Sequence, residues 1–443
     1  MSGWPVNIRD PVHNIISFED NALDRLLLAL INTKEFQRLR RIKQLGMSEL
    51  VFPGTNHSRF SHSIGVMNVA RIFVERLEKI LGAEAVQQQK DVLLVAALLH
   101  DVGHGPFSHA FEKITQENHE NRSREIIEDA STEVNQKLRS YNEDFPNRLI
   151  AFLDGNDIFS QVISSQLDAD RFDYLLRDSF SSGTEYGHFD FDWIIRHLNV
   201  DQTHNRFFLS HKAFLAAETY LFARYHMYRI VYFHKTTRSA EVMLKLIFQR
   251  YKELLDAKET DEEKKAVVPE VSSIVLSAFS SNGNMALSDY LLLDDYNITD
   301  FFKACLNAQD SVLRELGQGL LDRKLYKCID TSDVQDQATI QTFKQQAEQH
   351  ISQYITNNRL NQDISKYLLV SDKASDTPYK PYDPDADHPA TQLYVKVAGE
   401  ELREISQISE PIKPLQRKYN LLRFYFPERL REGLKGIASQ TLK

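Results

Sequence analysis

The chain has 443 residues, of which 42% are apolar and 26% charged, a composition typical of a globular protein longer than one ordinary domain. The formal net charge of −9 argues against general nucleic-acid binding as the main activity, and the two cysteines, Cys305 and Cys328, exclude a disulfide framework or a thiolate zinc site. No stretch reaches the roughly 20 apolar residues that span a bilayer, and no signal peptide is recognisable, so we expect a cytoplasmic protein without a membrane segment.

The N-terminal part of the chain predicts a short hairpin followed by helices. The hairpin lies in RDPVHNIISF, where apolar residues alternate weakly after an Asp-Pro pair. From Ala22 to about Gln44 the apolar residues have helical spacing, and Gly46 would end that helix. A second helical face runs through FSHSIGVMNVARIFVERLEKIL. The segment DVLLVAALLHDVGHG is apolar nearly all round, which predicts a helix buried in the centre of the core.

Helical spacing continues to about residue 330, with a possible hairpin near RHLNVDQTHNRFFLSHKAF. Residues 257–270 predict an exposed loop or a frayed helix end, and the Pro- and Asp-rich residues 371–392 predict a surface loop. The strand-like segments LYVKV and LLRFYF follow. We therefore expect a mainly α fold, with a helical core over residues 1–330 and a small mixed α/β lobe over 331–443 that serves assembly or regulation.

The segment LLHDVGHGPFSH places a dense polar cluster at the end of the apolar helix. His100 and Asp101 are adjacent, and at a helix end both side chains can turn toward one ion. Imidazole and carboxylate together suit Fe, Mn, Mg, Ni or Zn. A buried, satisfied hydrogen-bond network is the alternative. Two ligands do not complete a metal site, so the further candidates are His62 upstream and the aspartates of SSQLDADRFDYLLRD downstream.

The order His, His-Asp, Asp resembles the metal pattern of the HD superfamily of phosphohydrolases. Five segments are similar, in order and spacing, to its deoxynucleoside triphosphate triphosphohydrolase branch: FQRLRRIKQLG, HSRFSHSIGV, LLHDVGHGPFSHAFE, NHE and LDADRFDYLLRD. The similarity is dense over about residues 8–240, with the HD motifs at about 50–180. It implies a helical HD-domain core that hydrolyses dNTPs to deoxynucleoside and inorganic triphosphate, with a metal-bound water attacking the α-phosphorus.

The resemblance also assigns the reacting groups. The metal ligands that it implies for a divalent Mg, Mn, Fe, Ni or Zn ion are His62, His100, Asp101 and Asp170. Taken alone, His62 would be a buried hydrogen-bonded histidine and Asp170 a capping carboxylate. The catalytic set that it implies is His104, His109, Glu112 and His119. The first and last of these would contact the phosphates, and His109, steadied by Glu112, would protonate the 5′-oxygen. His119 would otherwise be an exposed loop histidine.

The substrate contacts implied by the resemblance surround this set. Three arginines would bind the triphosphate, with exposed surface charge as the alternative: Arg59, Arg171 and Arg224. Arg171 stands where the animal enzymes have a lysine, so it supplies charge with a different hydrogen-bond geometry. The sugar and base would be lined by Gln44, Leu45, Tyr174, Asp178 and Tyr232. The tyrosines would otherwise belong to the core.

The resemblance implies a homotetramer with a nucleotide activator at subunit interfaces. The animal enzymes recognise a guanine activator with an aspartate and a lysine, but Asn32 and Val6 stand here, while Gln37 and Arg40 persist. An asparagine offers one carbonyl oxygen to guanine's paired donors, where a carboxylate offers two. We therefore do not expect a guanine nucleotide as activator, although a different activator could occupy an equivalent interface. Two other functions stay open: an HD hydrolase of monophosphates or cyclic nucleotides, and a catalytically silent protein that senses nucleotides or binds nucleic acid.

Overall fold

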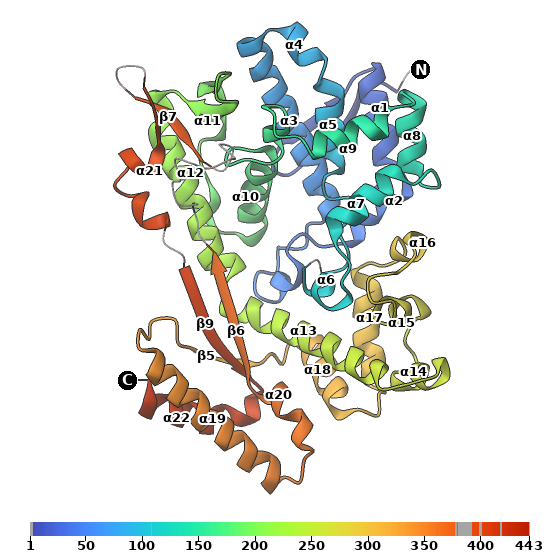
Figure 1. Ribbon diagram of the computed structural model, residues 1–443, viewed down its shortest axis with the longest axis vertical. Helices are drawn as coiled ribbons and strands as arrows, with labels where there is room; N and C mark the ends of the chain where they lie inside the picture. Colours follow the sequence, from blue (N-terminus) through green and yellow to red (C-terminus); the bar gives the residue numbers. More distant parts are fainter. Residues whose placement is uncertain are drawn as a thin grey trace.

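The computed structural model describes residues 3–107, 109–376, 379, 392–397, 401–416 and 419–442, and helices dominate them (Figure 1). Of residues 109, 110, 113, 374–376, 419 and 420, only the backbone belongs to the described part. In these ranges no helix is both long and apolar enough to cross a membrane. The mainly α fold class with a smaller mixed lobe is confirmed.

The N-terminal hairpin is confirmed, because β1 (Val6–Asp10) pairs antiparallel with β2 (Asn14–Phe18). The single helix expected from Ala22 to about Gln44 is wrong: the structure has α1 (Ala22–Ile31), α2 (Lys34–Arg38) and the 3-10 helix η1 (Leu39–Arg41). Two adjacent caps cause the break. The Asn32 amide donates to the Leu28 carbonyl (2.8 Å) at the end of α1, and the Thr33 hydroxyl accepts the Phe36 N–H (3.4 Å) at the start of α2.

The central helix predicted from DVLLVAALL is α5 (Lys90–Leu99), and its residues 92–99 are all at most 2% exposed. The long helix α3 (Arg59–Leu81) packs against α5 and against α10 (Ala169–Ser182). Because α5 is enclosed on every side, its C-terminal end is held at a fixed place in the core. The other helices of this region are α4 (Ala83–Gln87), α6 (His109–Thr115), α7 (His119–Glu128), α8 (Glu133–Tyr141), α9 (Phe145–Leu153), α11 (Phe191–His197) and α12 (Phe214–Met227).

A second group of helices packs around α13 (Lys235–Asp256), at the lower right in Figure 1. Instead of the loop or frayed helix end expected at 257–270, a separate helix forms, because Thr260 and Glu263 make a capping box at its start. The helices of this group are α14 (Asp261–Val267), α15 (Ser273–Ser280), α16 (Leu287–Tyr290), α17 (Asp295–Cys305) and α18 (Ser311–Leu321).

The C-terminal part contributes to two sheets. In the lower sheet of Figure 1, β9 (Tyr419–Phe426) lies between β5 (Lys327–Asp330) and β6 (Val370–Asp376), antiparallel to both. The helices here are α19 (Gln337–Asn357), α20 (Ser365–Leu368) and α22 (Arg431–Thr441). Beside α11 and α12, the predicted hairpin β3 (Leu198–Asp201) and β4 (Arg206–Leu209) is extended by β7 (Tyr394–Lys396) and β8 (Leu402–Glu404), followed by α21 (Ile405–Ile408).

The strands predicted from LYVKV and LLRFYF are therefore confirmed as β7 and β9. Of the surface loop expected at 371–392, the first six residues belong to β6, while 377, 378 and 380–391 lie outside the described residues. The strand β7 pairs parallel with β4, so the chain beyond residue 330 returns to the core sheet before it completes the lower sheet.

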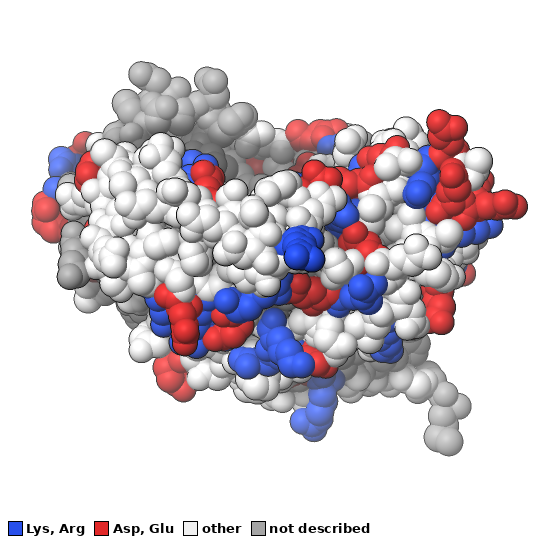
Figure 2. Space-filling view, turned by 90° about the horizontal axis from the view of Figure 1, so that it is seen from below, with Lys and Arg blue, Asp and Glu red and all other residues white. Residues whose placement is uncertain are grey.

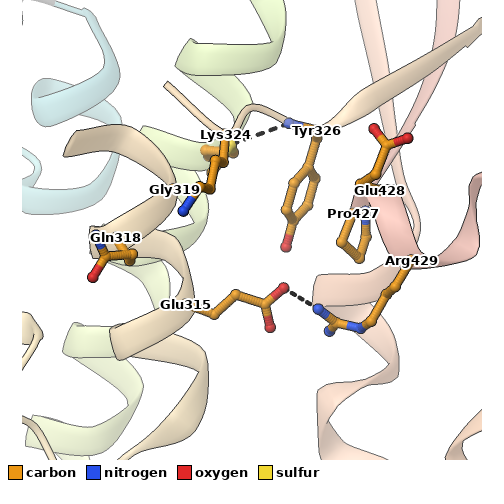
Figure 3. A pocket seen from close by; sticks show the side chains of 9 residues that line it. Glu315, Gln318, Gly319, Lys324, Tyr326, Pro427, Glu428 and Arg429 are labelled. Carbon is orange, nitrogen blue, oxygen red and sulfur yellow. Dashed lines mark hydrogen bonds and ion pairs between the residues drawn. The ribbon is translucent and has the colours of Figure 1, made fainter. Parts of the chain in front are cut away.

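The lower sheet meets the second helical group at a cavity of about 330 Å³ (Figure 3). Glu315 of α18 forms an ion pair across it with Arg429, which follows β9. The Tyr326 ring stands between these two walls, and its hydroxyl donates to the Tyr367 carbonyl (2.8 Å). One ion pair and one tyrosine thus link the two parts at this point.

Candidate metal and phosphate site

The four residues expected to bind metal come together from three helices. His62 lies on α3, His100 and Asp101 directly follow α5, and Asp170 lies in the first turn of α10. Donor atoms of His62, His100 and Asp170 lie within 4.8 Å of one another. His62 Nε2 is 3.1 Å from Asp170 Oδ1 and 3.8 Å from Asp101 Oδ2, while His100 Nε2 is 3.5 Å from Asp101 Oδ1. The four side chains therefore converge on one point.

Each of the two imidazoles turns one nitrogen toward this point. His62 Nε2 and His100 Nε2 are buried without a hydrogen-bond partner among the described residues, although carboxylate oxygens lie nearby. Their other nitrogens are engaged: His62 Nδ1 lies 2.8 Å from Asp173 Oδ2, and His100 Nδ1 lies 2.9 Å from the Ala97 carbonyl oxygen. Partners of this kind orient metal-binding histidines. The buried nitrogens and the two carboxylates fit a divalent transition metal or Mg²⁺.

The charges of the site favour a cation. Burial acts to lower the pKa of His62, but Asp170 and Asp173 outweigh it and raise the pKa to about 10. Burial acts to raise the pKa of Asp101, but His100 and Arg59 hold the pKa of that carboxyl well below its usual value. Burial would also raise the pKa of Asp170, but His100 and His62 lower it. The carboxylates of Asp101 and Asp170 are therefore both anionic near neutral pH.

The second cluster adjoins the first. His104 and His119 stack with ring centres 3.9 Å apart, and their Nδ1 atoms lie 3.5 and 3.1 Å from Glu112 Oε1. His104 Nε2 lies 3.2 Å from Asp101 Oδ1, so one carboxylate joins both clusters. Burial and the neighbouring Arg59 lower the pKa of His104, which favours a neutral imidazole. The side chain of His109, at the start of α6, lies outside the described residues.

The three arginines of the predicted site occupy different surroundings. Arg59 forms an ion pair with Asp101 and so lies at the junction of the two clusters. Arg171 forms an ion pair with Asp168, the N-cap of α10, and also donates to the Ser165 carbonyl (2.5 Å). Arg224 of α12 donates to Gln166 Oε1 (3.0 Å). The last two therefore flank the segment that leads into α10.

The residues expected at the sugar form a third group. The Tyr232 hydroxyl donates to Asp178 Oδ2 (2.7 Å), and the Tyr174 ring centre lies 6.3 Å from that of Tyr232. Gln44 Oε1 is buried without a hydrogen-bond partner among the described residues, and the Gln44 N–H donates to the His57 carbonyl (3.0 Å). Leu45, the next residue, is half-buried against the core.

Three side chains that support the site were not singled out from the sequence as functional. His57 Nε2 lies 2.8 Å from Asp178 Oδ1 and thus occupies the second oxygen of that carboxylate. His13, in the hairpin, lies 2.6 Å from Asp173 Oδ1, and Arg177 donates to both oxygens of Asp173. The spacing of Asp173 and Arg177, four apart on one helix, was a usable signal. Nothing in the sequence near His13 points to a partner 160 residues away.

Comparisons with known proteins agree with this geometry. Residues 59–171 match the HD domain family, and residues 189–275 match the HD associated region. The uncharacterized protein YwfO of Bacillus subtilis is 35% identical over 95% of this chain and 92% of its own. A SAMHD1 homolog of Dictyostelium discoideum, named as a deoxynucleoside triphosphate triphosphohydrolase, is 31% identical over 59% of this chain and 52% of its own.

Among solved structures, a phosphohydrolase of Bacteroides thetaiotaomicron has a TM-score of 0.77 and 26% identity, covering 96% of this chain and 100% of its own. The helical fold and its cluster of histidines and aspartates define a metal-binding hydrolase. The chain belongs to the HD-domain phosphohydrolase superfamily, and the resemblance inferred from the sequence motifs is confirmed.

Proposed function

We propose that this protein is a cytoplasmic deoxynucleoside triphosphate triphosphohydrolase, which releases deoxynucleoside and inorganic triphosphate. The observation that carries the proposal is the position of Asp101. This carboxylate lies against His100, a proposed metal ligand, and against Arg59 and His104, so one side chain joins the proposed metal centre to cationic and imidazole groups suited to phosphates. The dNTP hydrolase named among the relatives supports the same substrate class.

In the proposed reaction, a water oxygen bonds to the α-phosphorus, the bond from that phosphorus to the 5′-oxygen breaks, and the 5′-oxygen receives a proton. A divalent metal at His62, His100, Asp101 and Asp170 supplies Lewis acidity toward phosphate oxygens and favours deprotonation of water. Arg59 offsets phosphate charge, and His104 and His119 hold phosphate oxygens. We assign proton delivery to His109, with Glu112 steadying it.

The group around Asp178 suits a deoxyribose. Its two oxygens face His57 and Tyr232, so the carboxylate is fixed in position and can accept a hydrogen bond from a 3′-hydroxyl. In the proposal, the Tyr232 ring excludes a 2′-hydroxyl, and Tyr174 closes the same side of the sugar. Gln44 Oε1, which has no hydrogen-bond partner among the described residues, and Leu45 are assigned to the sugar and base, and Arg171 and Arg224 to the outer phosphates.

The test is a chromatographic product assay on all four dNTPs, singly and mixed, with Mn²⁺ or Mg²⁺. We expect equimolar deoxynucleoside and inorganic triphosphate, with an Asp101→Asn variant as the inactive control. Pyrophosphate with a nucleoside monophosphate, or stepwise release of single phosphates, contradicts the proposal. The alternative HD hydrolase is identified by two results together. The wild-type protein cleaves only monophosphates or cyclic nucleotides, and the Arg59→Ala variant cleaves them at the same rate.

A catalytically silent, nucleic-acid-binding protein is less well supported. On the face seen from below, a broad uncharged area lies beside a central and right-hand part where Lys and Arg side chains stand among Asp and Glu, so charges of both signs are mixed there (Figure 2). Such a face lacks the one-sign stripe that steers nucleic acid. Absence of hydrolysis of every dNTP by metal-loaded protein, alone or with mixed nucleotides, is the result that would favour this alternative.

We further propose that the protein forms a homotetramer regulated by a nucleotide activator. Asn32 donates its amide to the Leu28 carbonyl as the cap of α1, and Gln37 accepts from Arg40 (2.8 Å). These contacts organise the expected activator region without the carboxylate that would favour guanine. As a second place for an activator, separate from that region, we propose a cavity of about 380 Å³ beside the start of α13, which offers basic side chains to an anionic ligand: Lys235, Arg323, Lys327, Arg431 and Lys435.

A further inference from the structure

The catalytic turn, residues 100–107, is held largely from outside. Two backbone hydrogen bonds involve the turn and the residue before it: Val102 N–H to the Leu99 carbonyl (3.0 Å) and His104 N–H to the Asp101 carbonyl (3.1 Å). Residues 290–295, which connect α16 to α17 in the second helical group, supply further contacts. This 290–295 segment is almost 190 residues away in the sequence and belongs to neither the metal nor the sugar group.

The middle of the turn is held by Tyr290 of this segment and by Arg38 of α2, which also binds the segment. The buried Tyr290 hydroxyl donates to the Gly103 carbonyl (2.7 Å). Arg38 is 1% exposed and bridges the two segments, donating to the Leu293 carbonyl (2.8 Å) and to the His104 carbonyl (2.7 Å). The backbone on both sides of the phosphate-facing histidine is thus fixed by the 290–295 segment, directly or through one arginine.

Asp295 connects the turn to the opposite wall of the site. Its side chain is 4% exposed; Oδ1 accepts the Phe107 N–H (3.0 Å) and Oδ2 accepts the Lys43 N–H (2.8 Å). Lys43 pairs as an isolated β-bridge with Ser58, the residue before Arg59. One carboxylate therefore ties the turn that carries His104 to the strand-like pair that carries Arg59 and Gln44.

Capping of its own helix does not explain this carboxylate. Asp294 is the N-cap of α17 and accepts the helix N–H groups, whereas both oxygens of Asp295 serve two remote segments. Phe107 has φ of +50°, in the left-handed region that non-glycine residues rarely adopt and that persists only where the surroundings impose it. The bond from its N–H to Asp295 is one such constraint.

We propose that Asp295 is a positioning residue, which sets the distance between the phosphate-binding groups on the catalytic turn and those next to Lys43. The inference rests on the proposed function of the same site. In this role Asp295 acts on the proposed phosphate-binding groups through the backbone amides of Phe107 and Lys43. Tyr290 and Arg38 also hold the turn, as does the Ser123 hydroxyl, which accepts the Gly103 N–H (3.0 Å).

The experiment compares Asp295→Asn with Asp294→Asn, the same chemical change at the neighbouring buried carboxylate. An Asn at 295 presents an amide N–H to one of the two backbone donors, so one attachment is lost. We expect faster hydrogen exchange at the amides of 100–107 and 43–45, unchanged metal content, and kcat for dNTPs lowered roughly 10- to 100-fold with KM within about threefold. Asp294→Asn should retain wild-type exchange in these segments and wild-type kcat.

Three results overturn the proposal. The first is wild-type hydrogen exchange in the catalytic turn of Asp295→Asn, and the second is faster exchange there with unchanged kcat. The third is an equal loss of kcat in Asp295→Asn and Asp294→Asn. Tyr290→Phe, which removes only the hydroxyl bonded to Gly103, is the second variant if Asp295→Asn does not fold; it should raise exchange in the same turn. If wild-type protein hydrolyses no dNTP, the proposed function fails, while the exchange comparison still decides whether Asp295 holds the turn.

Discussion

At the scale of single residues, Asp173 acts on the proposed metal centre through His62. Its carboxylate lies 2.8 Å from His62 Nδ1 and also contacts His13 and Arg177. Burial acts to raise the pKa of Asp173, but Arg177 and the two histidines hold it well below its usual value. A permanently ionised partner at Nδ1 keeps the proton there, so that Nε2 of His62 is directed at the metal site.

An Asp173→Asn variant should therefore bind Mn²⁺ about 10- to 100-fold more weakly, because the amide holds the His62 imidazole less firmly. Metal titration monitored by calorimetry measures the change. The control is Asp24→Asn, which alters a buried carboxylate paired with Arg71 and remote from the metal. Equal Mn²⁺ affinity for wild type and Asp173→Asn would show that His62 needs no such partner.

At the scale of elements, the predictable part of the structure is local. The apolar run of α5 predicted its burial, and the motif spacings indicated which residues of α3 and α10 share one site. The break between α1 and α2 depended on side-chain caps at Asn32 and Thr33 that apolar spacing does not register. Contacts of His13 and Asp295 could not be predicted, because they join segments about 160 and 190 residues apart. Register and pairing at such separations are set by tertiary packing.

The attachment of the catalytic turn has a pH signature. Burial raises the pKa of Asp295 to about 6, although the amides of Lys43 and Phe107 act to lower it. The unfolded carboxyl ionises near 3.9, so unfolding releases a proton between about pH 4 and pH 6. A raised carboxyl pKa means that the contribution of this group to the free energy of unfolding falls as pH rises through that window.

The difference in unfolding free energy between wild type and Asp295→Asn should therefore decrease from pH 4 to pH 7, by up to about 3 kcal/mol. Urea unfolding at several pH values measures it, and the other titrating groups cancel in the difference. A difference that is constant or increases with pH would mean that the folded carboxyl keeps an ordinary or lowered pKa.

At the scale of the whole molecule, the basic cavity lies where three parts of the chain meet. Its lining comes from the start of α13, from the segment before β5 together with the first residues of β5, and from α22. Arg323 donates to the Leu50 carbonyl (2.6 Å), and Lys327 forms an ion pair with Glu428 (2.8 Å). An anion bound there would contact the helical core and the C-terminal part together, which is a geometry suited to coupling ligand binding to assembly.

A Lys327→Ala variant should lose activation by mixed dNTPs by at least about fivefold, the lower end of typical coupling, and keep its basal activity. Light scattering should show that nucleotides assemble the 51.3 kDa chain into tetramers in the wild type and not in the variant. Lys344→Ala is the control, because Lys344 lies on the outer part of α19 beside Glu348. Removing a lysine from an anion-binding cavity weakens binding, because the charge inside the cavity is poorly screened by solvent. Equal activation of wild type and Lys327→Ala would therefore mean that the activator binds elsewhere.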